Sequence, residues 1–562
     1  MSDIPDPDID GYRFHERDWE NFDQLRSEFE WEVPEQFNIA TYVCDRWADH
    51  KNRVALIEQA DGETTKYTFY ELDQLSSQLA NWFRNHGIEP GDRIATSGPQ
   101  RIETAVTYLA AWKLGAVPVP VSVLIGTDGL RYRMNDCEPE LFVIDQGSID
   151  TYRAVSDDIP SIGTVLTMQD VQSQAGEVEF WDEIDGYASD VETVETAAED
   201  DAAIIYTSGT TGQPKGVVHA HRGLLGTLPC VVTGVFNMQT DPATVGRIVP
   251  EWSWAGSILD VMLPLWYYGL PIVAVPNRDF DPEREFELVE EFGISIVNAP
   301  ATVFRMMMTQ VDDPIERYDL ASVRVFFSGG EAVGQDIMDW AAETFAGATV
   351  HEGYAQTEAP ALITDCETLD AGHIPGYMGR PAPGNEMAIL DLEADEPLKP
   401  GEVGEIAVRY EDNPQPFKEY WNKPDRTAAK VQNGWMRTED LGRRNEDGYF
   451  AFHSRKDNVI ISSGYRLSPE EIADALRNHE AVANAGVIGV PDDMRGEVPK
   501  AFVIPAAGYE ASEDLRETLQ QYVKDSLAKY EYPREIEFRE DLPKTTTGKV
   551  RLADLRKEEG IE

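Results

Sequence analysis

Between about residue 40 and residue 365, short apolar runs alternate with helix-like segments, and this alternation restricts the possible folds more than any other feature. In the first cycle, ELDQLSSQLANWFRNHG predicts a helix that ends at Gly87, GDRIATSG a strand, IETAVTYLAAWKLGA an apolar-faced helix, and AVPVPVS a strand. The second cycle contains AAIIY, a helix predicted from His219, PIVAV, REFELVEEFG, ISIVNAP and VRVFFSGGE. Such alternation predicts parallel α/β layers, in which ligands bind at the carboxyl ends of the strands.

The pattern changes after residue 375, where short β-like pieces (EMAIL, GEIAVR, GYFAFH) are separated by turn residues. After RKDN, helix and strand patterns return over about a hundred residues, a suitable size for a separate small domain. We therefore expect an α/β chain with a large N-terminal domain, made of two layered α/β subdomains plus a small β-rich subdomain, and a small α+β C-terminal domain. The predicted boundary lies between Lys456 and Asp457, giving domains 1–456 and 457–562. The acidic stretch 168–201 is predicted to be a surface loop.

The charge balance is strongly acidic, with 102 Asp and Glu against 48 Lys and Arg and a formal net charge of -54. Because the acidic excess is spread along the chain, its self-repulsion requires screening by concentrated salt, and the Debye length is about 3 Å at about 1 M. The composition predicts a cytoplasmic protein of a halophile that accumulates salt. It offers no basic face for nucleic acid or for an anionic membrane.

The four cysteines, Cys44, Cys137, Cys230 and Cys366, are far apart and form no CxxC pair. They are predicted to be buried thiols in a reducing compartment. The N-terminal MSDIPDPDID lacks the basic and apolar regions of a signal peptide, and no apolar run reaches the roughly 20 residues of a membrane span. We expect a soluble, intracellular protein.

The loop YTSGTTGQPKG at 206–216 has the composition of a phosphate site. Its glycines let backbone N–H groups approach a phosphate, its hydroxyls add donors, and Lys215 adds positive charge. A Walker loop is excluded, because Pro214 precedes that lysine and Gly216 follows it where Ser or Thr is needed. The composition alone is also compatible with a flexible turn. The candidate phosphate-binding residues are Thr207, Ser208, Gly209, Thr210, Thr211, Gly212 and Lys215.

Five further segments follow this loop in a fixed order: SGGE at 328–331, HEGYAQTE at 351–358, GWMRTEDLG at 434–442, SRKDNVIISSGYRL at 454–467 and PKTTTGK at 543–549. Together with the loop they resemble the motifs of the adenylate-forming superfamily, which includes acyl-CoA synthetases, aryl-CoA ligases and free-standing adenylation domains. The resemblance extends from about FNIATYVCDRWAD at residue 37 to LADLR near residue 552. Both ends look most like the medium-chain acyl-CoA synthetase branch.

The resemblance implies an ATP site with Mg²⁺, in which Glu358 holds the metal and Thr357 lies beside the α-phosphate. Magnesium prefers oxygen ligands, which suits this carboxylate. Asp440 would accept hydrogen bonds from the ribose hydroxyls, with help from Arg455. The family usually has Gly where Glu439 and Ser454 stand, so these two positions depart from its pattern. The other implied ATP-binding residues are Gly330, Glu331, Ala332, Glu352, Gly353, Tyr354, Ala355 and Gln356.

Lys549 is the implied catalytic lysine, since its ammonium could neutralise charge between the attacking carboxylate and the α-phosphate. In the resembling enzymes the small C-terminal domain is mobile and swings about a hinge, here Asp457, for the thiol step. Ser463, Gly464, Tyr465 and Arg466 would then line a channel for CoA. Arg495, Lys524 and Arg534 are candidates for the CoA phosphates, although surface ion pairs would explain these basic residues equally well.

The acyl pocket is expected at WSWAGS, 252–257, with Trp254 and Gly256 on its wall. In acetate-specific members a Trp stands before the Gln-Thr-Glu sequence and closes the pocket, and here that position is Ala355. Each buried CH₂ contributes about 0.8 kcal/mol, so the extra room favours an acid longer than acetate.

The sequence therefore predicts an AMP-forming acyl-CoA synthetase that uses ATP, Mg²⁺ and CoA on a medium-chain, branched or short-chain acid. An aryl-CoA ligase of the benzoate type and a free-standing enzyme that loads a carrier protein remain open. We expect small molecules as its partners, no binding of nucleic acid and no membrane span. Both a monomer and a homodimer are compatible with the sequence.

Overall fold

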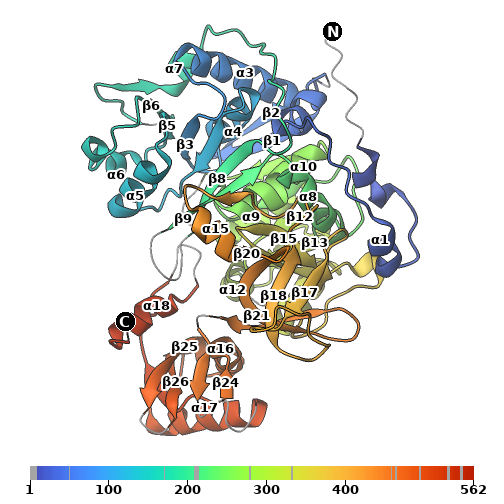
Figure 1. The fold of residues 1–562 in the computed structure, drawn as a ribbon, viewed down its shortest axis with the longest axis vertical. Helices are drawn as coiled ribbons and strands as arrows, with labels where there is room; N and C mark the ends of the chain where they lie inside the picture. Colours follow the sequence, from blue (N-terminus) through green and yellow to red (C-terminus); the bar gives the residue numbers. More distant parts are fainter. Residues whose placement is uncertain are drawn as a thin grey trace. The chain divides into compact units, whose positions relative to one another are not determined.

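The computed structural model in Figure 1 describes residues 9–49, 51–169, 171–207, 214–276, 280–330, 333–456, 458–462, 465–492, 495–527, 532–544 and 549–561. The chain divides into two compact units. The described residues of the first unit lie within Met1–Gly209, Gln213–Glu386 and Arg409–Met436, and those of the second within Met387–Val408 and Arg437–Glu562.

A nine-stranded sheet forms the centre of the first unit, in the order β16-β15-β14-β13-β12-β10-β11-β1-β2. The pairs from β1 through β11, β10, β12 and β13 to β14 are parallel, whereas β2, β15 and β16 pair antiparallel at the two edges. In chain order the strands are β1 (Val54–Ala60), β2 (Glu63–Thr68), β10 (Gly246–Ile248), β11 (Ile272–Ala274), β12 (Ile296–Asn298), β13 (Val325–Gly329), β14 (Thr349–Gln356), β15 (Ala359–Thr364) and β16 (Arg380–Pro381).

A second sheet in this unit is entirely parallel, in the order β4-β3-β5-β6-β7. Its strands are β3 (Arg93–Ser97), β4 (Val117–Pro120), β5 (Leu141–Ile144), β6 (Thr164–Thr167) and β7 (Glu177–Glu179). A third, antiparallel sheet has β9 (Lys215–Ala220) between β8 (Asp201–Thr207) and β19 (Glu419–Tyr420). The predicted α/β layers are thus present.

The helices of the first unit are α1 (Phe22–Glu28), α2 (Ile39–Val43), α3 (Phe69–Asn85), α4 (Ile102–Lys113), α5 (Thr127–Cys137), α6 (Ile149–Arg153), α7 (Phe180–Ile184), α8 (Gly223–Cys230), α9 (Ala255–Ser257), α10 (Leu263–Tyr267), α11 (Pro282–Phe292), α12 (Ala301–Gln310), α13 (Pro314–Arg317), α14 (Gln335–Thr344) and α15 (Pro424–Lys430). Two π-helical segments, η5 (Val231–Val235) and η6 (Ile258–Met262), extend α8 and α9.

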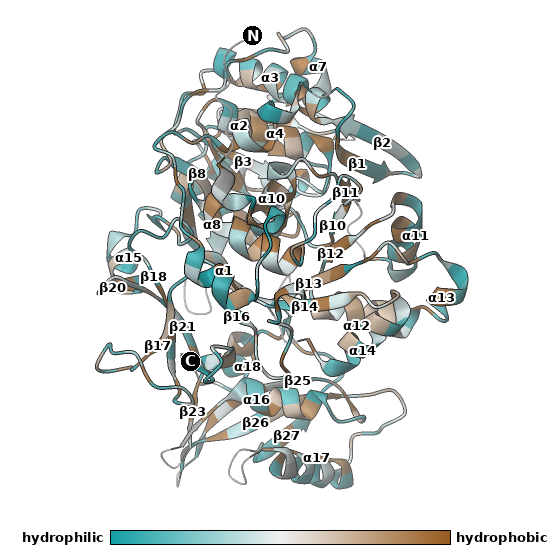
Figure 2. Cartoon of the chain, turned by 90° about the vertical axis from the view of Figure 1, so that its right-hand side faces the viewer, coloured by the Kyte–Doolittle hydropathy of each residue, from teal (hydrophilic) through white to brown (hydrophobic). Residues whose placement is uncertain are grey.

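The alternation of side chains along the strands explains how the layers pack. In β11, Ile272 and Ala274 join a core with α3, α4, α8 and α10 and with the parallel sheet. Val273 points to the opposite face, which α11, α12 and α14 cover. Figure 2 shows α4 and the central strands in brown and white, as expected for elements buried on both sides.

The second unit contains two β-rich parts, each with its own sheet. The first is built from β17 (Met387–Leu390), β18 (Gly404–Arg409), β21 (Trp435–Arg444) and β22 (Phe450–Arg455), while β20 (Val431–Gln432) pairs with the beginning of β21 inside the first unit. The second has the order β24-β23-β26-β25 with β27 beside β26. Its elements are β23 (Ile460–Ser462), β24 (Tyr465–Leu467), β25 (Val482–Asp492), β26 (Gly496–Pro505), β27 (Glu535–Phe538), α16 (Pro469–Arg477), α17 (Glu513–Ser526) and α18 (Leu552–Glu558).

Most predicted elements are confirmed, and two predictions are wrong. The helix expected from His219 begins only at Gly223, because His219 belongs to β9, where it is buried and pairs with Ala203 of β8. The stretch 168–201, predicted as a loop, contains β7 and α7, whose Phe180 and Ile184 enter the core. The four cysteines are free and buried, as predicted.

Within the described ranges, no helix has both the length and the apolar character required to span a bilayer. The predicted domain boundary between Lys456 and Asp457 stays a prediction, since Asp457 lies outside the described residues.

Candidate active site

Strands β8 and β9 form the two flanks of the predicted phosphate loop. Thr207, the last residue of β8, pairs with Lys215, the first residue of β9, and Tyr206 pairs with Gly216. A Cβ on Gly216 would stand only 2.8 Å from Ile204 Cγ2, so glycine is required for this close pairing. The candidates Ser208, Gly209, Thr210, Thr211 and Gly212 lie outside the described residues. The structure thus defines where the loop begins and ends.

Helix α5 anchors both flanks, which sequence reasoning did not anticipate. The Tyr206 hydroxyl donates to Asp136 Oδ2 at 2.7 Å, and the Tyr132 hydroxyl donates to the Pro214 carbonyl at 3.1 Å. Lys423 Nζ also contacts Asp136 at 2.8 Å. One carboxylate near the end of α5 therefore joins the loop flank to the segment after β19.

Thr357 and Glu358 form the turn of the β14–β15 hairpin, in which Gln356 pairs with Ala359. Glu358 is buried, and its carboxylate accepts a hydrogen bond from the Tyr420 hydroxyl at 2.5 Å. Lys215 Nζ lies 3.4 Å from the same hydroxyl, so Tyr420 connects the phosphate-loop lysine to the predicted metal ligand.

The charge state of Glu358 follows from these contacts. Burial alone would raise the pKa of its carboxyl, but the positive charge of Lys430, the Tyr420 hydrogen bond and the charge of Lys215 together hold the pKa below its usual value. A buried carboxylate that stays ionised is a suitable oxygen ligand for Mg²⁺.

No group of three or more potential metal-ligating side chains occurs among the residues that the structure describes. Mg²⁺ does not require such a group, because it usually binds through one or two carboxylates and completes its shell with substrate phosphates and water. A single ionised Glu358 fits this requirement.

The carboxyl ends of β13 and β14 are lined by glycines. Gly329 pairs with Gly353, and a Cβ on Gly353 would stand 2.4 Å from the Phe327 ring. Gly330, directly after β13, has a φ of +88°, which favours glycine. Ser328 pairs with Glu352, which is buried. Glu331 and Ala332 lie outside the described residues.

The remaining residues of this motif lie at the end of β14. Tyr354 is buried, whereas Ala355, Gln356 and Thr357 are partly exposed, as expected where a strand leaves the sheet. The acyl-pocket candidates belong to a neighbouring element: Trp254 precedes α9 and Gly256 lies within it, and α9 packs against β15.

Asp440 and Arg455 are cross-strand partners in β21 and β22 of the second unit, and Arg455 Nη1 lies 3.2 Å from Asp440 Oδ1. Glu439 adopts a φ of +64°. The chain therefore keeps the left-handed backbone that glycine favours, although a glutamate occupies the position. Ser454, the other departure from the family pattern, is buried in β22.

The other predicted residues of the second unit are only partly brought together. Lys524 Nζ and Arg534 Cζ lie 4.0 and 4.2 Å from the centre of the Tyr532 ring, so two of the three CoA-phosphate candidates share one aromatic side chain. Arg495 lies elsewhere, where its backbone N–H donates to Asp492. Lys549 is exposed next to Val550, which pairs with Lys544.

Of the thiol-channel candidates, Tyr465 and Arg466 belong to strand β24, where they pair with Ser462 and Ile461. Ser463, Gly464 and the hinge residue Asp457 lie outside the described residues.

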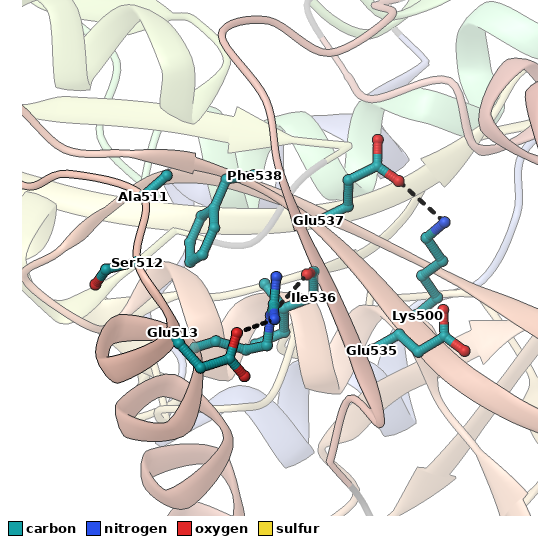
Figure 3. A pocket seen from close by; sticks show the side chains of 9 residues that line it. Lys500, Ala511, Ser512, Glu513, Glu535, Ile536, Glu537 and Phe538 are labelled. Atoms are coloured by element: carbon teal, nitrogen blue, oxygen red, sulfur yellow. Dashed lines mark hydrogen bonds and ion pairs between the residues drawn. The ribbon is translucent and has the colours of Figure 1, made fainter.

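A pocket of about 550 Å³ in the second unit contains none of the predicted site residues (Figure 3). Its two basic side chains are already paired, Lys500 with Glu537 and Glu559, and Arg516 with Glu513. The lining residues are Lys500, Ala511, Ser512, Glu513, Arg516, Glu535, Ile536, Glu537 and Phe538. This pocket offers no unpaired cation for a CoA phosphate.

A layered α/β unit with glycine-lined strand ends and an ionised hairpin carboxylate suits a ligase that activates a carboxylic acid as an adenylate. The chain belongs to the AMP-binding enzyme family: the model for "AMP-binding enzyme" matches residues 44–421, and the model for "AMP-binding enzyme C-terminal domain" matches residues 471–549.

Relatives agree with this membership. The uncharacterized acyl-CoA ligase YtcI of Bacillus subtilis is 33% identical over 94% of this chain and 97% of its own. Mouse mitochondrial acyl-coenzyme A synthetase ACSM3 is 30% identical over 99% of this chain and 97% of its own. The ATP-bound RpMatB–BxBclM chimera B1 superposes with a TM-score of 0.82 at 27% identity, covering 93% of this chain and 98% of that one. The chain is accordingly an AMP-forming acyl-CoA synthetase, and ATP and CoA are the substrates that fit its family.

Proposed function

We propose that the protein converts a medium-chain or branched carboxylic acid into its CoA thioester in two steps. In the first, a carboxylate oxygen attacks the α-phosphorus of ATP, the bond to the β-phosphate breaks, and pyrophosphate leaves. In the second, the thiolate of CoA attacks the acyl carbon and AMP leaves. The observation that best supports this assignment is the buried, ionised Glu358 carboxylate, joined through Tyr420 to Lys215.

In the adenylation step Glu358 serves as an oxygen ligand, and Mg²⁺ bound there would neutralise charge on the ATP phosphates. Thr357, next to it in the hairpin turn, donates to the α-phosphate. Lys215 supplies positive charge to the departing pyrophosphate, as its place at the start of β9 allows. Asp440 accepts from the ribose hydroxyls, with Arg455 as its charge partner. Lys549 neutralises charge as the carboxylate and the α-phosphate approach each other.

In the thioester step Lys549 withdraws as the small domain turns about Asp457, and the segment 463–466 lines the entry of the thiol. Lys524 and Arg534 bind phosphates of CoA. Their shared position around Tyr532 supports this role, since both cations are held by one ring and remain adjacent.

The small side chain of Ala355 supports a substrate longer than acetate. Ala355 is partly exposed at the end of β14, where an indole would fill space that a methyl group leaves to the acid. The net charge of -54 supports activity at high salt in the cytoplasm of a halophile.

The test is a panel of linear, branched and aryl acids assayed in concentrated KCl, with pyrophosphate release and CoA-thioester formation followed separately. We expect the highest kcat/KM for thioester formation with medium-chain or branched acids. Pyrophosphate release without a thioester would contradict the CoA ligase assignment and favour a carrier-protein acceptor, whereas a preference for benzoate would contradict the proposed substrate class.

A further inference from the structure

The two π-helical segments of the first unit, η5 and η6, pack against each other, and η6 continues α9, which carries the predicted acyl-pocket residues. π-helical turns are rare and often occur at functional sites. Asp260 lies at the centre of η6, and its neighbours Ile258, Leu259, Val261 and Met262 are all buried. A single acidic side chain therefore stands in an otherwise apolar segment.

Asp260 is more than nine-tenths buried, yet its Oδ1 has no hydrogen-bond partner in the part of the chain that the structure describes. By contrast, the buried Glu285 pairs with Arg247 at 2.7 Å, and the partly buried Asp45 pairs with Lys113 at 2.5 Å. Burial raises the pKa of Asp260 well above its usual value, which favours the uncharged acid form of the group.

The position of Gly256, one helical turn earlier, shows on which side the carboxyl is left uncovered. A Cβ on Gly256 would stand 3.7 Å from Asp260 Oδ2, with no other described atom outside the local helix and chain neighbours within 4 Å. There is therefore room for a methyl group between Gly256 and the Asp260 carboxyl, on the face of α9 predicted to line the acyl pocket. The carboxyl also acts on the Cys230 thiol of α8, whose pKa is raised mainly by burial and further by Asp260.

An unpaired buried carboxyl destabilises the fold, so its presence beside an open helix face requires an explanation. We propose that Asp260 determines substrate specificity: its carboxylic acid group donates a hydrogen bond to, and accepts one from, a hydroxyl group on the chain of the acid that the enzyme activates. This inference rests on the proposed function and refines its substrate class to medium-chain acids that carry an uncharged polar group.

The experiment compares hexanoate with its 3-, 4-, 5- and 6-hydroxy derivatives, using kcat/KM for thioester formation. For the wild-type protein we expect at least one hydroxy acid to exceed hexanoate by about 10- to 100-fold, the usual effect of leaving a buried polar group unpaired. This comparison needs no variant. A wild-type preference for hexanoate over every hydroxy acid would overturn the inference.

Two substitutions separate recognition from structure. D260N keeps an uncharged hydrogen-bonding group and should retain the selectivity to within about threefold, whereas D260L should reduce the hydroxy-to-alkyl ratio by about tenfold or more. A ratio that is equal in wild type and D260L would contradict the proposal. A preference for 6-aminohexanoate over the hydroxy acids would overturn it as well, because an ammonium group requires the ionised form.

The matched control is E103Q, which alters a buried carboxyl that accepts from Trp181 and should leave the ratio unchanged. Thermal unfolding of the unliganded protein gives a second readout: D260L should unfold at a higher temperature than the wild type, since it removes the unpaired group. If hexanoyl-CoA forms but no hydroxy acid is preferred over hexanoate, only the inference about Asp260 fails. If no acid yields a thioester, the proposed function fails with it.

Discussion

Tyr420 occupies the point where three charged side chains of the first unit meet. Its hydroxyl donates to Glu358, Lys215 Nζ lies 3.4 Å from its oxygen, and the charge of Lys430 acts on the same carboxylate. The lowered pKa of Glu358 means that the ionised form persists below pH 4.5 and is lost as the pH falls through the folded-state value.

We expect Y420F to weaken Mg-ATP use about tenfold or more at neutral pH, since a hydrogen bond to a charged group contributes about 1.5–3 kcal/mol. Because the variant lacks one cause of the lowered pKa, the acid limb of its pH profile should move to higher pH. The measurement is kcat/KM for pyrophosphate release across the acid range. Y410F is the control, as the Tyr410 hydroxyl donates to the Lys418 carbonyl. Identical acid limbs in Y420F and wild type would show that Tyr420 does not tune Glu358.

Ala355 gives the second prediction at this scale. In A355W the indole should occupy the room left at the end of β14, so the ratio of kcat/KM for octanoate to that for propionate should fall by about tenfold or more, each excluded CH₂ being worth about 0.8 kcal/mol. The assay is thioester formation along a chain-length series. An unchanged chain-length preference would show that Ala355 does not limit the pocket.

Local motifs singled out Glu358 and Lys215 as candidates, but they did not point to the side chains that act on Glu358 or anchor the loop flank. Tyr420, Lys430 and Asp136 are far from their partners in sequence and carry no motif of their own. Sequence reasoning flagged Glu439 as a departure from glycine, yet only the structure revealed that the backbone keeps a φ of +64° there. Asp260 gave no signal either, because one acid in an apolar run has no periodicity.

Among the elements, the β13–β14 ladder depends on close contact between glycines and an aromatic ring. In G353A the new methyl carbon would stand 2.4 Å from Phe327 Cζ, so we expect destabilisation of about 1–3 kcal/mol, the usual cost of overpacking. The measurement is the thermal unfolding midpoint. G126A is the control, because Gly126 has a φ of −84° and no heavy atom within 4 Å of a built Cβ. The double variant G353A/F327L should recover part of the stability lost in G353A. If it does not, the contact with Phe327 is not the cause of the destabilisation.

Element prediction succeeded where one physical signal dominated. The helix predicted to end at Gly87 was recognised by its clear apolar spacing and by the glycine that follows it. In the structure α3 ends at Asn85, and Gly87 has the φ of +85° that is common just after helices. Prediction failed at His219, because β9 is buried on both faces and so lacks the alternation of a half-exposed strand. The antiparallel pairing of β9 with β19 could not be predicted, since β19 comes roughly 200 residues later.

At the scale of the whole molecule, substitution of Lys549 tests whether adenylation and thioester formation require different positions of the small domain. We expect K549A to reduce acyl-adenylate formation by about a thousandfold while sparing thioester formation from supplied acyl-AMP, since electrostatic groups at developing charge contribute effects of this order. The two half-reactions are assayed separately. K544A is the control, as Lys544 belongs to the same segment and pairs with Asp541. An equal loss of both half-reactions would argue against separate arrangements.

The net charge of -54 gives the second prediction at this scale. Raising KCl from about 0.2 M to about 2 M should raise the unfolding temperature by about 10 °C or more, because screening weakens the repulsion between surface carboxylates. The measurement is thermal unfolding at constant pH. Sucrose of matched osmolality is the control, since it is not ionic. An equal effect of sucrose would assign the stabilisation to water activity instead of charge.

The third strand of the β8–β9–β19 sheet has a consequence for biosynthesis. When the ribosome has completed β9, roughly 200 residues must still be made before β19 exists, which takes about 10–40 s at about 5–20 residues per second. During that interval one edge of β9 has no partner, and such edges can pair with other nascent chains. Chaperone capture of the nascent chain is therefore expected to be strongest between completion of β9 and emergence of Tyr420.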